Sequence, residues 1–72
     1  MNLTPTIRGN NLALYDTTNG SIYKTIALPP GTYSNIIVSG DRVSITITPT
    51  YGMDRIRTFN TKTGALISDI QI

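Results

Sequence analysis

Residues 15–23 read Tyr15-Asp16-Thr17-Thr18-Asn19-Gly20-Ser21-Ile22-Tyr23, and residues 59–67 repeat the pattern as Phe59-Asn60-Thr61-Lys62-Thr63-Gly64-Ala65-Leu66-Ile67. In both stretches an aromatic residue precedes Asp or Asn, a Thr-rich turn closes with Gly, and an apolar segment follows. The two glycines, Gly20 and Gly64, lie 64 − 20 = 44 residues apart. A period of roughly 40–50 residues indicates a repeated supersecondary unit. We therefore expect Gly20 and Gly64 to occupy equivalent left-handed or turn positions.

Period-two patterning and turn residues predict an all-β chain. Glu is absent and Ile, Thr and Tyr are abundant, which disfavours helices and favours strands. Val43, Ile45 and Ile47 alternate with polar residues, as in a strand with one buried face. The segment Pro29-Pro30-Gly31 is the strongest break, because consecutive prolines cannot extend a sheet ladder. Seven strands are predicted: Thr4–Arg8, Leu12–Thr17, Ser21–Leu28, Ser34–Ser39, Arg42–Thr48, Met53–Asn60 and Ala65–Ile72.

The apolar faces of these strands predict a single core. No linker or low-complexity segment interrupts the chain, so we expect residues 1–72 to form one small antiparallel sheet domain. Tyr15 is expected in the core, because its counterpart in the second repeat is Phe59. The other predicted core residues are Leu12, Leu14, Ile22, Ile26, Ile37, Val43, Ile45, Ile47, Ile56, Leu66 and Ile70.

Composition argues against several kinds of chemistry. The 72 residues include no His and no Cys, which excludes His-based catalytic triads, disulfides and the usual zinc-ligand sets. The net charge of +2 comes from six basic and four acidic residues spread singly, which does not indicate nucleic-acid or membrane binding. We therefore expect no enzymatic activity, no cofactor and no metal. No signal peptide or transmembrane segment is visible, so we expect a location in the cytoplasm or within a virus particle.

Two hairpin sequences are similar to a known repeat. Residues 12–23, Leu-Ala-Leu-Tyr-Asp-Thr-Thr-Asn-Gly-Ser-Ile-Tyr, and residues 56–67, Ile-Arg-Thr-Phe-Asn-Thr-Lys-Thr-Gly-Ala-Leu-Ile, resemble the blade hairpin of quinoprotein-dehydrogenase-like β-propellers. The resemblance implies one four-stranded blade over Ser34–Ile70 and the outer half of another over Leu12–Leu28. It implies no cofactor-binding residue in this chain.

The sequence also departs from that family. The Trp that these repeats carry near the end of the last strand is replaced by Lys24 and Ser68. About one and a half blades could complete a propeller only if several copies assembled. From the residues alone, two hairpins with Asx-containing turns fit any antiparallel sheet, so a small β-barrel or sandwich is the alternative fold.

Four residues are candidates for a binding surface. Arg55 and Arg57 lie two residues apart on a predicted strand and share a face with Phe59. Two guanidiniums beside an aromatic ring can bind phosphate, carboxylate or a stacked base. Tyr33 and Tyr51 stand in or beside Pro- and Gly-rich loops, and we expect both to be exposed. The alternative is that the arginines only solubilise an outward face while Phe59 packs at its edge.

The leading functional hypothesis is a non-enzymatic structural or binding module that acts through self-assembly or protein–protein contact, such as a small virion component. The last strand, Ala65–Ile72, remains apolar to its end, and an exposed apolar edge is a surface for strand pairing. We expect a terminal strand to pair with another subunit, giving a homo-oligomer, or to close the domain end to end.

Two other functions remain open. One is a glycan-binding, lectin-like module that uses tyrosines, although Trp is absent. The other is a basic module that binds nucleic acid or inhibits a partner through its arginines, which are Arg8, Arg42, Arg55 and Arg57.

Overall fold

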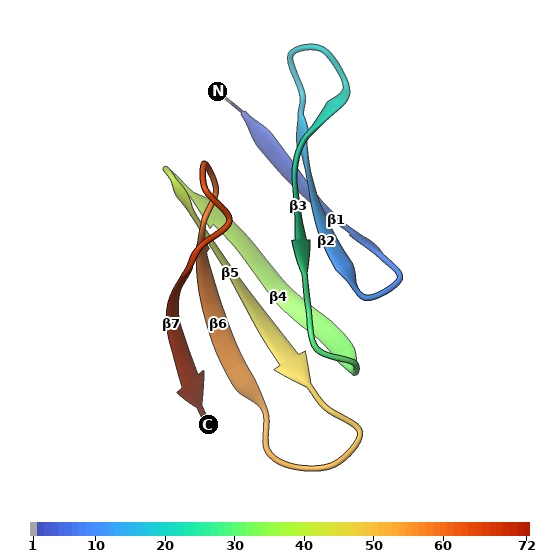
Figure 1. Ribbon diagram of the computed structural model, residues 1–72, viewed down its shortest axis with the longest axis vertical. Helices are drawn as coiled ribbons and strands as arrows, with labels where there is room; N and C mark the ends of the chain where they lie inside the picture. The colour runs from blue at the N-terminus through green and yellow to red at the C-terminus, as the bar shows by residue number, and fades with distance from the viewer. Residues whose placement is uncertain (1) are drawn as a thin grey trace.

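The computed structural model describes residues 2–72, which form seven strands in two antiparallel sheets (Figure 1). The strands are β1 (Leu3–Arg8), β2 (Asn11–Asp16), β3 (Ser21–Ala27), β4 (Thr32–Ser39), β5 (Arg42–Thr48), β6 (Arg55–Asn60) and β7 (Leu66–Gln71). The first three form a three-stranded sheet in chain order, and the last four form a four-stranded sheet in chain order. All seven predicted strands are present with ends within two residues of the prediction, so the all-β antiparallel fold is confirmed.

The described residues do not close into a barrel. β1 pairs only with β2, and β7 pairs only with β6. The expectation that the terminal strands could close the domain end to end is therefore wrong, because these strands lie at the edges of different sheets. The change of sheet occurs between β3 and β4, at Pro29-Pro30-Gly31, where the prolines lack the N–H groups that a continuing ladder needs.

The two repeated turns have the same geometry. Gly20 and Gly64 have φ angles of 72° and 77°, in the left-handed region, as the repeat predicts. Their N–H groups donate to the carbonyls of Asp16 and Asn60, each at 2.8 Å. The Oδ1 atoms of Asp16 and Asn60 accept a further bond from the N–H two residues later, at 2.9 and 2.8 Å. Both turns are thus held by an Asx side chain and completed by a glycine.

The strands that flank these turns also pair in the same register. Leu12 lies opposite Ile26 in the β2–β3 hairpin, and Ile56 lies opposite Ile70 in the β6–β7 hairpin. Both hairpins have a register shift at the same point, which leaves one extra residue in the later strand. These bulge residues are Tyr23 and Ile67. The sequence repeat is therefore a structural repeat of one hairpin, including its bulge.

The core lies between the two sheets. Its centre is formed by β2 and β5, whose inward residues are fully buried. The predicted inward face of β5 is confirmed, and two residues that the sequence did not assign, Leu28 and Phe59, complete the cluster. The core residues are Leu12, Leu14, Ile26, Leu28, Val43, Ile45, Ile47 and Phe59.

Several residues predicted for the core lie outside it. Ile37 pairs with Ser44, which alternates with Val43 and Ile45, so Ile37 lies on the opposite face of the sheet. The pairing of β4 with β5 shifts by one residue near Asn35, which has a φ of 51°, and this shift determines that Ile37 points outward. The misassigned residues are Ile22, Ile37, Leu66 and Ile70, which are exposed, and Tyr15 and Ile56, which are half-buried outside the core cluster.

Candidate binding sites

An open pocket of about 260 Å³ lies at one end of the four-stranded sheet and contains three of the four predicted binding residues. Arg55 and Arg57 enter it from β6, opposite Ile47 and Ile45 of β5, so they share the inward face of this sheet. Tyr51 reaches the pocket from the β5–β6 loop. The other residues lining the pocket are Pro29, Ile47, Pro49, Gly52, Met53 and Gln71.

The two guanidiniums of this pocket, hereafter the arginine pocket, meet on one carboxylate. Asp69 Oδ2 lies 3.5 Å from Arg55 Nη1 and 3.2 Å from Arg57 Nε. All three side chains are partly exposed, so water screens these ion pairs. Within residues 2–72, Arg57 Nε is buried and makes no hydrogen bond, so its contact with Asp69 is an ion pair only. Two positive charges and one negative charge leave the pocket with an excess positive charge.

Asp69 is the site residue that sequence reasoning missed. The bulge at Ile67 places Asp69 opposite Arg57 in the β6–β7 pairing. Without that extra residue, Ser68 would stand opposite Arg57 instead. The turn fixes where the hairpin reverses, but the bulge that selects the acidic partner has no distinct signal in one sequence.

The two tyrosines predicted to be exposed have different environments. Tyr51 is 91% exposed, which confirms the prediction for this side chain. Tyr33 is half-buried on β4 and packs against the core, so the prediction of exposure is wrong there. Its hydroxyl lies within hydrogen-bonding distance of the Pro29 carbonyl and Asn10 Oδ1. Tyr33 therefore supports the loop behind the arginine pocket and does not line the pocket.

The four-stranded sheet has a second surface of interest on its other side. We define its outer face as the strand residues that point away from the three-stranded sheet: Thr32, Ser34, Ile37, Ser39, Arg42, Ser44, Thr46, Thr48, Ile56, Thr58, Asn60, Ser68 and Ile70. Arg42, at one end of β5, is the only charged residue among them. Ser44 and Thr58 satisfy each other with a hydroxyl–hydroxyl hydrogen bond of 2.9 Å. The outer face thus carries a single charge at one end and is partly apolar.

The edge strand β7 adds apolar surface beside the outer face. Leu66, Ile67 and Ile70 are exposed along it, and Ile72 follows. Edge strands are commonly protected by proline or by a free charge. β1 carries Pro5, whereas the charge on β7, Asp69, is paired with two arginines. The charge on β7 is therefore engaged in two ion pairs.

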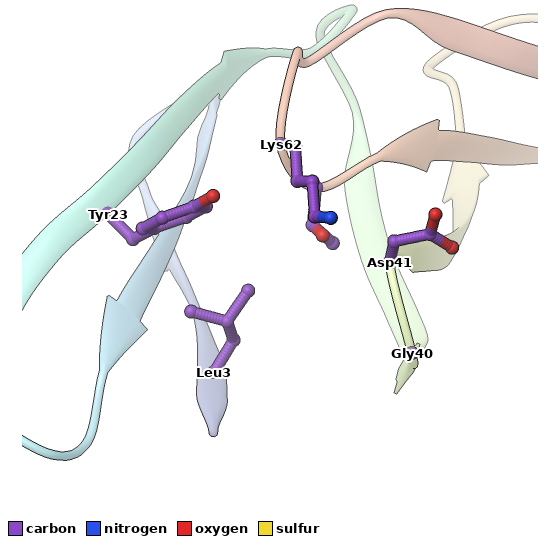
Figure 2. Close-up of a pocket in the computed structure, with 6 residues that line it drawn as sticks. Leu3, Tyr23, Gly40, Asp41 and Lys62 are labelled. Atoms are coloured by element: carbon purple, nitrogen blue, oxygen red, sulfur yellow. The ribbon is translucent and has the colours of Figure 1, made fainter. Parts of the chain in front are cut away.

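A second open pocket, of about 290 Å³, lies between the two sheets at the other end of β6 (Figure 2). Tyr23 and Leu3 line it from the three-stranded sheet, and Asp41 and Lys62 line it from turns of the four-stranded sheet. Figure 2 shows the Asp41 and Lys62 side chains on the same side of this pocket. The lining of this pocket therefore carries one negative and one positive side chain.

The described residues show no cluster of three or more acidic, His or Cys side chains that could hold a metal ion. Over the same residues, no helix is long and apolar enough to cross a membrane.

Comparison of the chain with protein-family models, with curated proteins and with solved structures gave no match.

Proposed function

We propose that this chain is a non-enzymatic structural module that acts by assembling with further copies of itself. The observation that carries the proposal is the outer face, where Ile37 and Ile70 are 62% and 58% exposed. Covering these side chains with another protein surface would remove apolar area from water, at about 25 cal/mol per Å². Exposed apolar patches of this kind are typical of interaction surfaces.

A second copy of the chain suits this surface. The only charge on the outer face is Arg42 at one end of β5, at the opposite end of the sheet from Ile70, so a second copy can cover the apolar part of this face without meeting a charged residue there. A chain of 72 residues without disulfides also buries limited apolar surface on its own. Burial between copies would add to the small core that lies between its two sheets.

One form that the proposed assembly can take is a propeller-like ring of several chains. The repeated hairpins and the four-stranded, sequentially ordered sheet support this form, because a chain with one complete sheet and one incomplete sheet needs partners to close a ring. A small component of a virus particle is the biological setting that we propose. A compact, Cys-free chain rich in Thr, Asn and Ile suits repeated use in such a particle.

The solution mass tests this proposal. We expect light scattering at micromolar concentration to give a mass of several chains, and Ile70→Asp to shift the mass towards that of one chain. Met53→Asp is the matched control, because Met53 is 57% exposed but lies in the β5–β6 loop away from the outer face. A wild-type mass of one chain over the accessible concentration range would refute the proposal.

A second candidate function is the binding of a small ligand that carries a carboxylate or phosphate group. The specific observation is the arginine pocket, where Arg57 Nε is buried without a hydrogen bond and the exposed Tyr51 ring stands at the rim. Arginine binds planar anions in two-pronged fashion, and the tyrosine offers a face for a sugar or base ring. An acidic sugar carries both a carboxylate and a ring, so it is the kind of glycan that we propose for this pocket.

Chemical-shift changes on titration with glucuronate and with inorganic phosphate test this second function. We expect both ligands to perturb resonances of β6 and of the β5–β6 loop, and Arg57→Gln to weaken the effect. Arg42→Gln is the control, because Arg42 pairs with Asn60 at the opposite end of β6 from Arg55. Changes confined to other parts of the chain would exclude this pocket as the site.

A nucleic-acid-binding role has less support, because the arginines do not gather on one surface. Arg8 lies on β1 and donates to the Tyr15 hydroxyl at 3.4 Å. Arg42 and Arg55 stand at opposite ends of the four-stranded sheet. Binding to a nucleic-acid backbone is favoured by a continuous basic stripe.

A further inference from the structure

The repeated hairpin uses its two faces differently in its two copies. In the β2–β3 hairpin, one face consists of Leu12, Leu14 and Ile26, and all three are buried against the four-stranded sheet. The positions that correspond to them in the β6–β7 hairpin, 44 residues on, are Ile56, Thr58 and Ile70, and these lie on the outer face. Ile26 is 5% exposed, whereas its counterpart Ile70 is 58% exposed.

The opposite face of the hairpin shows the reverse relation. In the β6–β7 hairpin, Arg57 and Phe59 point inward, and Phe59 packs in the core against the three-stranded sheet. Their counterparts in β2, Ala13 and Tyr15, lie on the side of the three-stranded sheet that points away from the core. We call this side, with Thr6 and Thr25 opposite Ala13, the rear side.

Two hairpin faces meet in the contact between the sheets, and each of them has an equivalent in the other hairpin that no sheet covers. The face that docks in the first hairpin has no sheet packed on it in the second hairpin. The face that receives in the second hairpin has no sheet packed on it in the first, where side chains of the same sheet cover the buried Ala13. We infer that the outer face of one copy binds the rear side of another copy, so that the packing between the two sheets of one chain is repeated between chains. This inference rests on the proposed self-assembly and adds the identity of the two surfaces.

The chemistry of the two surfaces is compatible. Arg8 is the only charged residue among the described strand residues of the rear side, and its guanidinium lies on the Tyr15 hydroxyl above the buried Ala13. The outer face carries one charge of its own, Arg42, which lies at the opposite end of the sheet from Ile70, and it offers no carboxylate. Small hydroxyl and methyl groups, as on Thr6 and Thr25, allow two sheets to pack closely at about 10 Å.

The symmetry of such an assembly follows from the surfaces. A contact between two different surfaces is heterologous, so every copy can contact one neighbour through its outer face and another through its rear side. Repetition then gives a closed ring or an open filament. An isologous dimer, in which two outer faces meet, is the competing arrangement and uses one surface only.

Two single variants distinguish these arrangements. Ile70→Asp blocks the outer face and leaves the rear side intact, and Thr25→Asp blocks the rear side and leaves the outer face intact. Thr25 is exposed on β3, so the change removes no core contact. Because both variants carry a new negative charge, the two blocked surfaces repel each other and cannot pair artificially. Circular dichroism and thermal melting verify that each variant is folded.

We expect each variant alone to have the mass of one chain, and an equal mixture to form a dimer that contains one copy of each. A dimer is the limit, because the intact outer face of one variant binds the intact rear side of the other and no free surface remains. The mixture is measured at up to about 1 mM, since a single contact lacks the extra stability of a closed ring.

The other outcomes are equally informative. If Thr25→Asp forms dimers alone and does not combine with Ile70→Asp, the outer faces pair with each other, which overturns the head-to-tail contact and leaves self-assembly intact. If wild-type chain assembles but the mixture stays monomeric, the inferred surfaces are wrong. If wild-type chain is itself monomeric, the proposed function fails first.

Discussion

The residues that close the repeated turns need backbone conformations that most side chains resist. Gly20 and Gly64 both have positive φ, and replacing either by Val should reduce the free energy of unfolding by about 1 kcal/mol or more. We expect similar losses at the two positions, because both have positive φ, nothing lies within 4 Å of a Cβ at Gly20, and a Cβ at Gly64 would lie 3.4 Å from the flexible end of Lys24, which is an ordinary contact. Urea denaturation measures both, with Thr18→Val in the exposed first turn as the control. Unchanged stability in both variants would contradict the structural repeat.

Asp69 determines how much positive charge the arginine pocket presents. Asp69→Asn keeps the shape of the side chain and removes the charge that Arg55 and Arg57 share. We expect a loss of stability below about 1 kcal/mol, because the ion pairs are partly exposed. Phosphate affinity should rise roughly fivefold, since one unit charge at contact distance is worth about 1 kcal/mol in water. Phosphate titrations followed by NMR give the affinity, and an equal rise in Asp41→Asn, in the other pocket, would contradict a local effect.

At the scale of strands, the two faces of the four-stranded sheet should differ sharply in their sensitivity to truncation. Ile45 on β5 is fully buried, and Ile45→Ala should cost about 2–5 kcal/mol. Ile37 on β4 is 62% exposed, so Ile37→Ala should change stability by less than about 0.5 kcal/mol. Chemical denaturation at low protein concentration, where chains are separate, measures the difference. Similar losses in the two variants would show that the outer face is covered within the chain itself.

The strands could be predicted because their ends are set by local chemistry. Asx residues, glycines and the Pro29-Pro30 pair interrupt the chain at points that short-range rules identify. The direction of the side chains could be predicted for β5, where only one face is apolar, but not for β4 or β7. In those strands isoleucines occur in both phases, and bulges near Asn35 and at Ile67 change which phase faces inward.

The same limit applies to the candidate site. Arg55 and Arg57 could be placed on a common face because residues two apart in any strand share one. Their position at the rim of the inward face, beside Ile45 and Ile47, depends on the pairing of β6 with β5, which is a longer-range property. The partner Asp69 depends on the bulge in β7. The sequence therefore predicts the cationic pair, while tertiary packing determines its depth and its counter-charge.

At the scale of the whole molecule, each sheet contains one copy of the same hairpin, and the two copies turn opposite faces towards the core. The three-stranded sheet covers one side of the four-stranded sheet, and the opposite side carries the counterparts of residues that are buried in the first hairpin. A sequence alone shows that the hairpin recurs. The sequence does not show which face of each hairpin copy is covered by the other sheet. That assignment requires the strand registers and the burial of the side chains.

Assembly through these surfaces should make thermal stability depend on protein concentration. A partner that binds only the folded chain stabilises it by mass action, so Tm should rise as concentration increases. For a domain of this size, 1 kcal/mol of added stability corresponds to about 4–8 °C. We expect Ile70→Asp to abolish the dependence and to have a Tm near that of wild-type chain at high dilution, because Ile70 is 58% exposed and lies outside the core cluster. Calorimetric scans over a range of concentrations measure this. A wild-type Tm that is constant across the range would contradict assembly, whereas a variant Tm that is lower even at high dilution would mean that Ile70 stabilises the single chain.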